Sequence, residues 1–410
     1  MNTNTLKKYV ELTLKIGINL QKDQPLVIMS PVETADFTRL LVEEAYELGA
    51  KEVIVHWSDD FCKKMKFIHA DEDIFKIMPA WQVESLMYYA KRNGAFISIS
   101  ATDPELLKGI DSKKIAISQN TRNVALKDYY EKVMSNEIQW NIISVPTVAW
   151  AKKVFPEIED EKIAVEKLWE AIISAVKADT KDPIQTWHNH IATLKEKMDY
   201  LNENQFKTFI IKNSLGTNLK VDLPKNHLWC SGKDTTKSGI DFVANIPTEE
   251  VFSMPHKYGV NGIVYASKPL NYGGTLIENF SITFKDGEIV DFEAKSGKEA
   301  LQNLIDTDAG SKYLGEIALV PFDSPISNSN ILFYNTLFDE NASCHLAIGQ
   351  AYPSCITDGD NLDAEGMEKV GMNDSLTHVD FMFGTSDLDI TGIKEDGTEI
   401  KIFVKGNWGF

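Results

Sequence analysis

Short apolar runs alternate with amphipathic stretches along the first 200 residues. A helical period of apolar positions predicts a helix over 6–17, and a second helix is expected over 34–48, with Gly49 placed to end it as a left-handed cap. Buried-strand patterns occur at 25–29, 52–57, 95–100 and 140–145. Strands that alternate with helices predict a mainly parallel sheet covered on both faces.

The pattern changes beyond residue 150. Two helices are expected, over 154–178 and 191–201, with a turn at 181–183 between them. Strand-like runs then follow at 207–211, 219–223, 262–266, 280–284, 288–293 and 388–392, and Asp286-Gly287 is a strong hairpin turn. We therefore expect an α/β scaffold domain over 1–200 and a strand-rich α+β domain over 201–410.

Composition and charge restrict the function. The 410 residues carry 42 Lys plus Arg against 60 Asp plus Glu, a net charge of −18, so nucleic acid is not an expected partner. No apolar run is long enough to span a membrane, and charges at Lys7, Lys8, Glu11 and Lys15 interrupt any signal peptide. The four cysteines lack CxxC spacing, which favours a reducing cytoplasm over a disulfide framework.

One segment near the C-terminus has the spacing of a metal site. On a strand, His378 and Asp380 point to the same face, and an imidazole beside a carboxylate suits a divalent metal. The alternative is a simple His–Asp hydrogen bond on a half-buried strand. The acidic loop from Asp358 does not supply a calcium site, since Leu362 and Asp363 occupy the fifth and sixth positions of an EF-hand loop.

Other residues strengthen the metal interpretation. Glu249 and Glu250 are adjacent, so only one of them can face a given side, and Glu316 begins an otherwise apolar strand, where an unpaired acid is costly. His345 starts a segment of small residues. Together these carboxylates and imidazoles match the ligand count of a two-metal hydrolase. No GxSxG or activated cysteine offers a nucleophile, so water activated by metal is the simpler mechanism.

The sequence resembles the thermophilic-type metalloaminopeptidases, the family of aminopeptidase T, aminopeptidase S and PepS. The resemblance extends over the whole chain, including the opening α/β unit. Its most specific stretches are NIPTEEVF at 245–252, GEIALVP at 315–321, LFDENASCHLAIGQAYP at 337–353 and SLTHVDFMFGTSDLDITG at 375–392.

The resemblance implies an exopeptidase that removes N-terminal residues from peptides. It assigns two divalent metals (Zn, Co, Mn or Mg) to five ligands, of which Glu316 would bridge the ions: Glu250, Glu316, His345, His378 and Asp380. Tyr352 would be the active-site tyrosine, and Glu340 is a candidate ligand or acid–base group. The family also implies a homodimer whose metal site faces an enclosed cavity.

Two other functions stay open at this point. A metal-dependent dipeptidase or amidohydrolase acting on another small amide would need the same ligands. A non-catalytic peptide-binding dimer would retain the fold but would require the loss of at least one ligand. None of the motif positions is lost in this chain.

Overall fold

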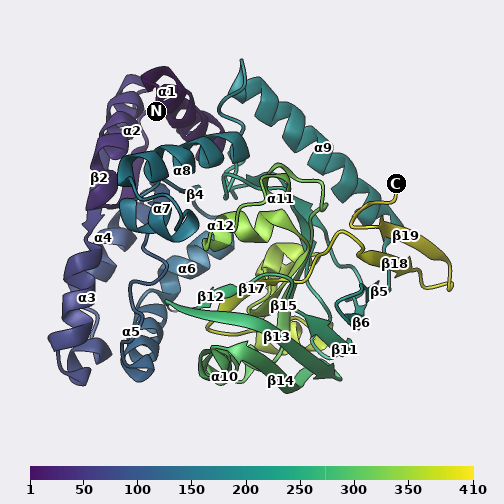
Figure 1. Ribbon diagram of the computed structural model, residues 1–410. Coiled ribbons are helices and arrows are strands. Elements are labelled where there is room, and N and C mark those ends of the chain that lie inside the picture. Colours follow the sequence, from purple (N-terminus) through teal and green to yellow (C-terminus); the bar gives the residue numbers. More distant parts are fainter. Residues whose placement is uncertain (273) are drawn as a thin grey trace. The chain divides into compact units, whose positions relative to one another are not determined.

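The computed structural model describes residues 1–272 and 274–410 (Figure 1). The chain folds into two compact units. The first contains Met1–Ile191, Lys233–Thr248 and Leu332–Leu337, and the second contains Ala192–Gly232, Glu249–Ile331 and Phe338–Phe410. The chain therefore passes between the units several times.

The first unit is built on a four-stranded parallel sheet with strand order β2-β1-β3-β4. Its apolar strands are the predicted ones, which confirms the expected α/β architecture of this part of the chain. The elements are α1 Thr3–Leu12, β1 Pro25–Pro31, α2 Ala35–Glu47, β2 Glu52–Ser58, α3 Asp60–His69, α4 Ala80–Ala90, β3 Ala95–Ile99, α5 Ser112–Ala125, α6 Lys127–Met134, β4 Trp140–Ile143, α7 Val148–Val154 and α8 Glu161–Ala175. A short hairpin, β8 Asp234–Thr235 with β9 Asp241–Phe242, completes it.

Local chemistry sets the helix boundaries. After α2, Gly49 adopts a positive φ of 94°, as expected for a left-handed cap. The helix predicted over 154–178 is confirmed as α8 but starts too early, because α7 ends at Val154, Pro156 follows, and α8 begins only at Glu161. The helix predicted over 191–201 is too short: α9 spans Pro183–Asn204 and begins at the proline of the predicted turn.

The second unit contains two antiparallel sheets, which confirms its strand-rich character. The five-stranded sheet has the order β17-β16-β15-β10-β7, with β7 Cys230–Ser231, β10 Val251–Ser253, β15 Leu314–Leu319, β16 His345–Gly349 and β17 His378–Met382. The nine-stranded sheet contains β5 Thr208–Lys212, β6 Asn218–Asp222, β11 Val260–Tyr265, β12 Leu270–Tyr272, β13 Thr275–Lys285, β14 Glu288–Ser296, β18 Asp389–Ile393, β19 Glu399–Val404 and β20 Asn407–Trp408. Helices α10 Lys298–Ile305, α11 Pro325–Asn328 and α13 Ala364–Val370 lie in the connections, and α12 Thr336–Asp339 crosses from the first unit's last segment into the second.

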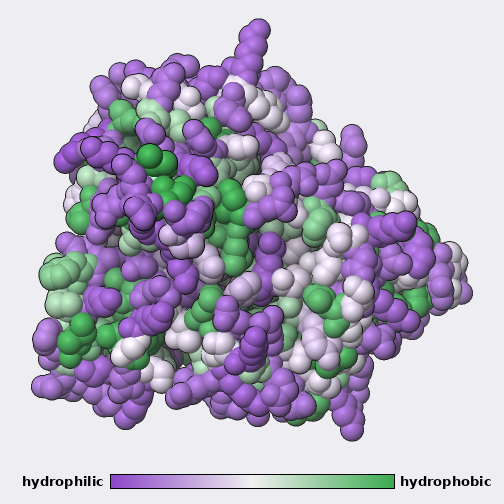
Figure 2. Space-filling model, viewed as in Figure 1, coloured by the Kyte–Doolittle hydropathy of each residue, from purple (hydrophilic) through white to green (hydrophobic). Residues whose placement is uncertain are grey.

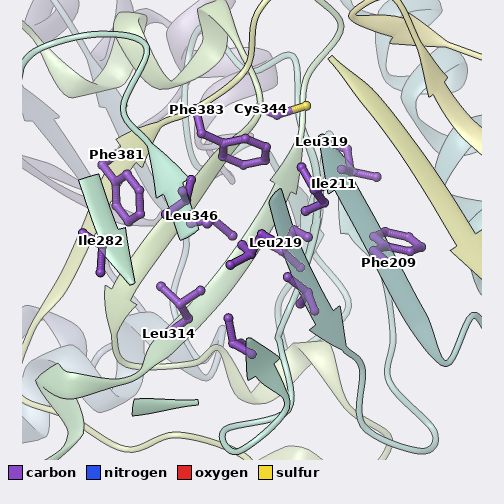
Figure 3. Close-up of a cluster of buried hydrophobic side chains, with 14 of the residues drawn as sticks. Phe209, Ile211, Leu219, Ile282, Leu314, Leu319, Cys344, Leu346, Phe381 and Phe383 are labelled. Carbon is purple, nitrogen blue, oxygen red and sulfur yellow. The ribbon is translucent and has the colours of Figure 1, made fainter. Parts of the chain in front are cut away.

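One hydrophobic core joins the two sheets of the second unit. Figure 3 shows Ile211 and Leu219 of the larger sheet in the same cluster as Leu314 and Leu346 of the smaller one. All four side chains are buried. One face of the five-stranded sheet therefore packs in the core, and the polar side chains of its strands project from the other face.

One face of the molecule is largely hydrophilic. Purple, hydrophilic residues cover most of the face shown in Figure 2, in keeping with a sequence in which 25% of residues are charged. Among residues 1–272 and 274–410, no helix is both long enough and apolar enough to cross a bilayer.

Candidate active site

The pairing of β15, β16 and β17 places predicted ligands on the face of the five-stranded sheet that lies opposite the core. Glu316 on β15 pairs with Ala347 on β16, which in turn pairs with Asp380 on β17. Directly opposite residues on neighbouring strands point to the same face, so Glu316 and Asp380 project together, separated by a methyl group. His378 lies two residues before Asp380 and shares their face.

A second row crosses the same face. Phe252 on β10 pairs with Ala318 on β15, and Ala318 pairs with His345 on β16. Glu250 lies just before β10, and its carboxylate is 3.1 Å from His345 Nε2 on this face. The small side chains of Ala318 and Ala347 leave room between the larger polar side chains of this face. The alternate residues of the same strands point to the opposite face and belong to the hydrophobic core.

The five predicted ligands form two overlapping groups centred on Glu316. Glu250, Glu316 and His345 make one group, while Glu316, His378 and Asp380 make the other, with ligand atoms within 4.8 Å of one another in each. His345 Nε2 lies 3.1 Å from Glu250 Oε2 and 3.5 Å from Glu316 Oε1. His378 Nε2 lies 3.4 Å from Glu316 Oε2 and 3.4 Å from Asp380 Oδ1. The two oxygens of Glu316 therefore face different histidines.

Main-chain carbonyls orient both imidazoles. His345 Nδ1 lies 3.2 Å from the Ser343 carbonyl oxygen, and His378 Nδ1 lies 2.7 Å from that of Gln350. A carbonyl only accepts hydrogen bonds, so Nδ1 carries the proton in each ring. In the neutral rings, Nε2 then presents a lone pair to the site, which is the usual arrangement of metal-binding histidines.

The candidate ligands carry buried negative charge that a cation would stabilise. Burial by itself lowers the pKa of His345 and of His378, and the surrounding carboxylates raise both pKa values well above the ordinary range. In the described ranges 1–272 and 274–410, no Lys or Arg forms an ion pair with Glu250, Glu316 or Asp380. The negative charge is balanced only if protons or metal ions enter.

Donor chemistry also fits a divalent metal. The buried Asp380 Oδ1 has no hydrogen-bond partner in the part of the chain that the structure describes, which leaves it available as a ligand atom. Imidazole nitrogens and carboxylate oxygens together are suitable ligands for Zn, Co or Mn, and the carboxylates also suit Mg. These five residues would hold the ions.

The last two predicted residues stand beside this group. Tyr352 packs edge-on against His378, with ring centroids 5.0 Å apart. Burial, followed by the charges of Glu316 and Asp380, raises the pKa of Tyr352 well above its ordinary value, so its hydroxyl stays protonated. Glu340 begins a buried 3₁₀ turn, and burial and then the neighbouring Asp380 raise its pKa well above that of an ordinary carboxyl.

A family model agrees with this geometry. The model described as thermophilic metalloprotease (M29) matches residues 2–408. The chain belongs to this family. Its members are metal-dependent peptide hydrolases, so this M29 protein is one too.

Individual relatives match along nearly their whole lengths. "Aminopeptidase 2" of Geobacillus stearothermophilus is 48% identical over 405 residues, which cover 99% of this chain and 98% of the relative. "Aminopeptidase AmpS" of Bacillus subtilis is 46% identical with the same coverage. The solved structure of wild-type AmpT from Thermus thermophilus superposes with a TM-score of 0.92 at 39% identity, covering 99% of both chains, which confirms the fold class.

Sequence reasoning missed the residues that support the M29 site. Asn341 is buried, its Oδ1 accepts a hydrogen bond from the Glu249 main-chain N–H at 2.7 Å, and its Nδ2 lies 3.5 Å from Glu340 Oε1. It thereby links the Glu249–Glu250 segment to Glu340. The carbonyls of Ser343 and Gln350 were also missed, since a main-chain contact leaves no signal in side-chain identity.

Proposed function

We propose that this chain is an aminopeptidase that removes N-terminal residues from peptides with the help of two divalent metal ions. The observation that carries the proposal is the position of Glu316, whose Oε1 faces His345 and whose Oε2 faces His378. Glu316 belongs to both groups of candidate ligands, and a carboxylate shared in this way is suited to a pair of ions. The identified M29 relatives, which are named aminopeptidases, support the peptide substrate.

The protein's own residues supply the rest of the chemistry. When bound, divalent ions lower the pKa of water and polarise a carbonyl group. Glu340 accepts the proton of the attacking water and returns it to the leaving amine, a role favoured by its buried position and raised pKa. Tyr352 keeps its phenolic proton and donates a hydrogen bond to the oxygen that gains negative charge.

The ligand set also favours cleavage at the N-terminus. Glu250, Glu316, Glu340 and Asp380 face only two imidazoles in this site, and two divalent ions would offset their charge. A free α-amine, which an internal peptide segment lacks, would bind to a metal ion held there. An acetylated peptide should therefore be a poor substrate.

We also propose a cytoplasmic homodimer. The family resemblance supports the dimer, and four free cysteines are compatible with a reducing compartment. Light scattering coupled to size-exclusion chromatography would test the assembly, with twice the chain mass of 46.1 kDa expected. A single-chain mass at micromolar concentration would overturn it, and cell fractionation tests the compartment.

The activity is tested on peptides with free and acetylated N-termini. Metal-stripped protein is assayed alone and after addition of Co, Zn, Mn or Mg. We expect stepwise loss of N-terminal residues that needs metal and is blocked by acetylation. Metal binding without cleavage of any peptide would shift the function to another small amide, and no metal binding would overturn the site.

A substitution of Glu316 distinguishes loss of activity from loss of the fold. Glu316→Gln should remove turnover and reduce the number of bound ions while the circular dichroism spectrum stays unchanged. Glu293→Gln is a matched control, since Glu293 is an exposed residue of β14 paired with Lys298 at 3.0 Å. Full activity of Glu316→Gln would contradict the proposal.

A further inference from the structure

An aromatic side chain shares the sheet face of the metal ligands. Phe252 follows Glu250 by two residues, and its pairing with Ala318, which pairs with His345, places its ring on the ligands' face of the sheet. Val251 between them belongs to the core on the opposite side. The Phe252 ring is half-buried rather than fully enclosed, and so retains surface that a ligand can contact.

Phe252 is connected to the site through Tyr352. Their ring centroids are 5.6 Å apart, and those of Tyr352 and His378 are 5.0 Å apart. Three rings thus lead from Phe252 to a predicted metal ligand. A group bound at the ligands with an apolar extension of a few ångströms would meet the Phe252 ring along this path.

The surroundings of Phe252 are apolar. It packs against a cluster whose buried members include Met254, Ile356 and Met372. Leu362 and Met367, which also pack against this cluster, are partly exposed like Phe252 itself. Methionine side chains are flexible and adapt to ligands of different shape. No member of this cluster, here called the Phe252 wall, carries a charged side chain.

We propose that Phe252 is a specificity-determining residue that contacts the side chain of the peptide's first residue. This proposal rests on the aminopeptidase function proposed above. The substrate's α-amine lies at the group of metal ligands, and its first side chain lies against the Phe252 wall. The preferred substrates are therefore peptides that begin with a large apolar residue, because a charged side chain would lose its hydration there without gaining a partner.

The test compares leucyl and alanyl p-nitroanilides on the metal-loaded protein. The wild-type protein should prefer the leucyl substrate by at least about tenfold in kcat/KM, the discrimination that extra methylene groups provide in an apolar pocket. Phe252→Ala should lower this ratio by about fivefold or more while retaining alanyl turnover. Phe252→Leu, which keeps an apolar side chain, should preserve most of the ratio.

The controls distinguish a change in substrate specificity from a general loss of activity caused by altered packing. Phe292→Ala removes a partly buried ring of the other sheet, on β14, and should leave the ratio unchanged. An equal loss on both substrates in Phe252→Ala would mean that Phe252 only supports Tyr352, and would overturn the proposal. An unchanged ratio would overturn it too. Absence of turnover of both substrates by the wild-type protein with every metal would instead overturn the aminopeptidase function itself.

The increase in Tm caused by free amino acids provides a second readout. L-leucine should raise the Tm of the wild-type protein more than L-alanine at equal concentration, since a ligand that binds the folded state stabilises it. Phe252→Ala should remove this difference. Equal shifts by both amino acids in the wild-type protein would contradict the proposal.

Discussion

Glu250 and His345 form the closest contact between candidate ligands, with Oε2 and Nε2 3.1 Å apart. The surrounding carboxylates raise the pKa of His345 well above its ordinary value, so without metal the ring keeps a proton on Nε2 and pairs with Glu250. A divalent ion would take the place of this single proton and bring more positive charge to the buried carboxylates. The folded state is therefore expected to gain stability from metal ions.

Removal of metal should lower the Tm, because the buried carboxylates then repel one another. At a free metal concentration about 100 times Kd, binding adds about 2.7 kcal/mol to the free energy of unfolding. Differential scanning fluorimetry with increasing Zn, Co, Mn or Mg measures the shift. Glu316→Gln, which loses the shared ligand, should show a smaller shift; a Tm that is unaffected by every ion would contradict the expectation.

Tyr352→Phe should reduce kcat by about 100- to 1,000-fold, the usual effect of losing one hydrogen bond to an oxyanion. The protonated hydroxyl is the group removed, and the ring that packs against His378 remains. Calorimetry should show unchanged metal affinity, which separates a catalytic role from a ligand role. Tyr265→Phe on β11 is the control and should keep full activity. A kcat within about threefold of the wild-type value would exclude the role assigned to Tyr352.

Ala347→Val should weaken metal binding. Ala347 is fully buried and pairs with both Glu316 and Asp380, so two added methyl groups would crowd these carboxylates. We expect a loss of about 10- to 100-fold in metal affinity, as for other residues that support ligands. Overpacking should also cost about 1–3 kcal/mol of stability. Calorimetry and urea unfolding measure the two effects, and Ala294→Val on β14 is the control. Unchanged metal affinity would argue against the crowding.

Asp234→Asn should stabilise the protein at alkaline pH. Burial raises the pKa of Asp234 from 3.8 to about 6, and the hydrogen bond from Asn136 Nδ2 offsets only part of this effect. The folded state thus binds the proton more tightly than the unfolded state. The stability due to this proton is fully present below pH 3.8 and is lost as the pH rises through 6. At pH 8 the variant should gain about 1–3 kcal/mol, and the gain should vanish near pH 4.

Asp241→Asn provides a control of opposite sign for this pH dependence. The hydrogen bond from Lys233 Nζ lowers the pKa of Asp241, so its ionised form stabilises the fold at neutral pH. Its replacement should lower the Tm at pH 8 and have little effect at low pH. Equal pH profiles of the two variants, measured by thermal unfolding, would show that the local environments do not set these pKa values.

Much of the fold follows from local sequence patterns. The apolar runs of β1 to β4 and the Asp286-Gly287 turn act over a few residues, so their structures could be predicted without knowledge of their partners. The late start of α8, beyond Pro156, was missed because apolar residues also precede this proline. The spacing of apolar residues does not show that a proline lacks the N–H group needed for helical hydrogen bonding.

For the candidate site, the sequence by itself placed His378 and Asp380 on one face, because the side-chain period of a strand is two. Only the tertiary structure decided that Glu316 lies across Ala347 from Asp380, and that Phe252 joins Tyr352 beside them. These relations depend on the register between strands that are far apart in the chain. A shift of one residue would turn every side chain of a strand to the other face, and the packing of the whole core is what prevents it.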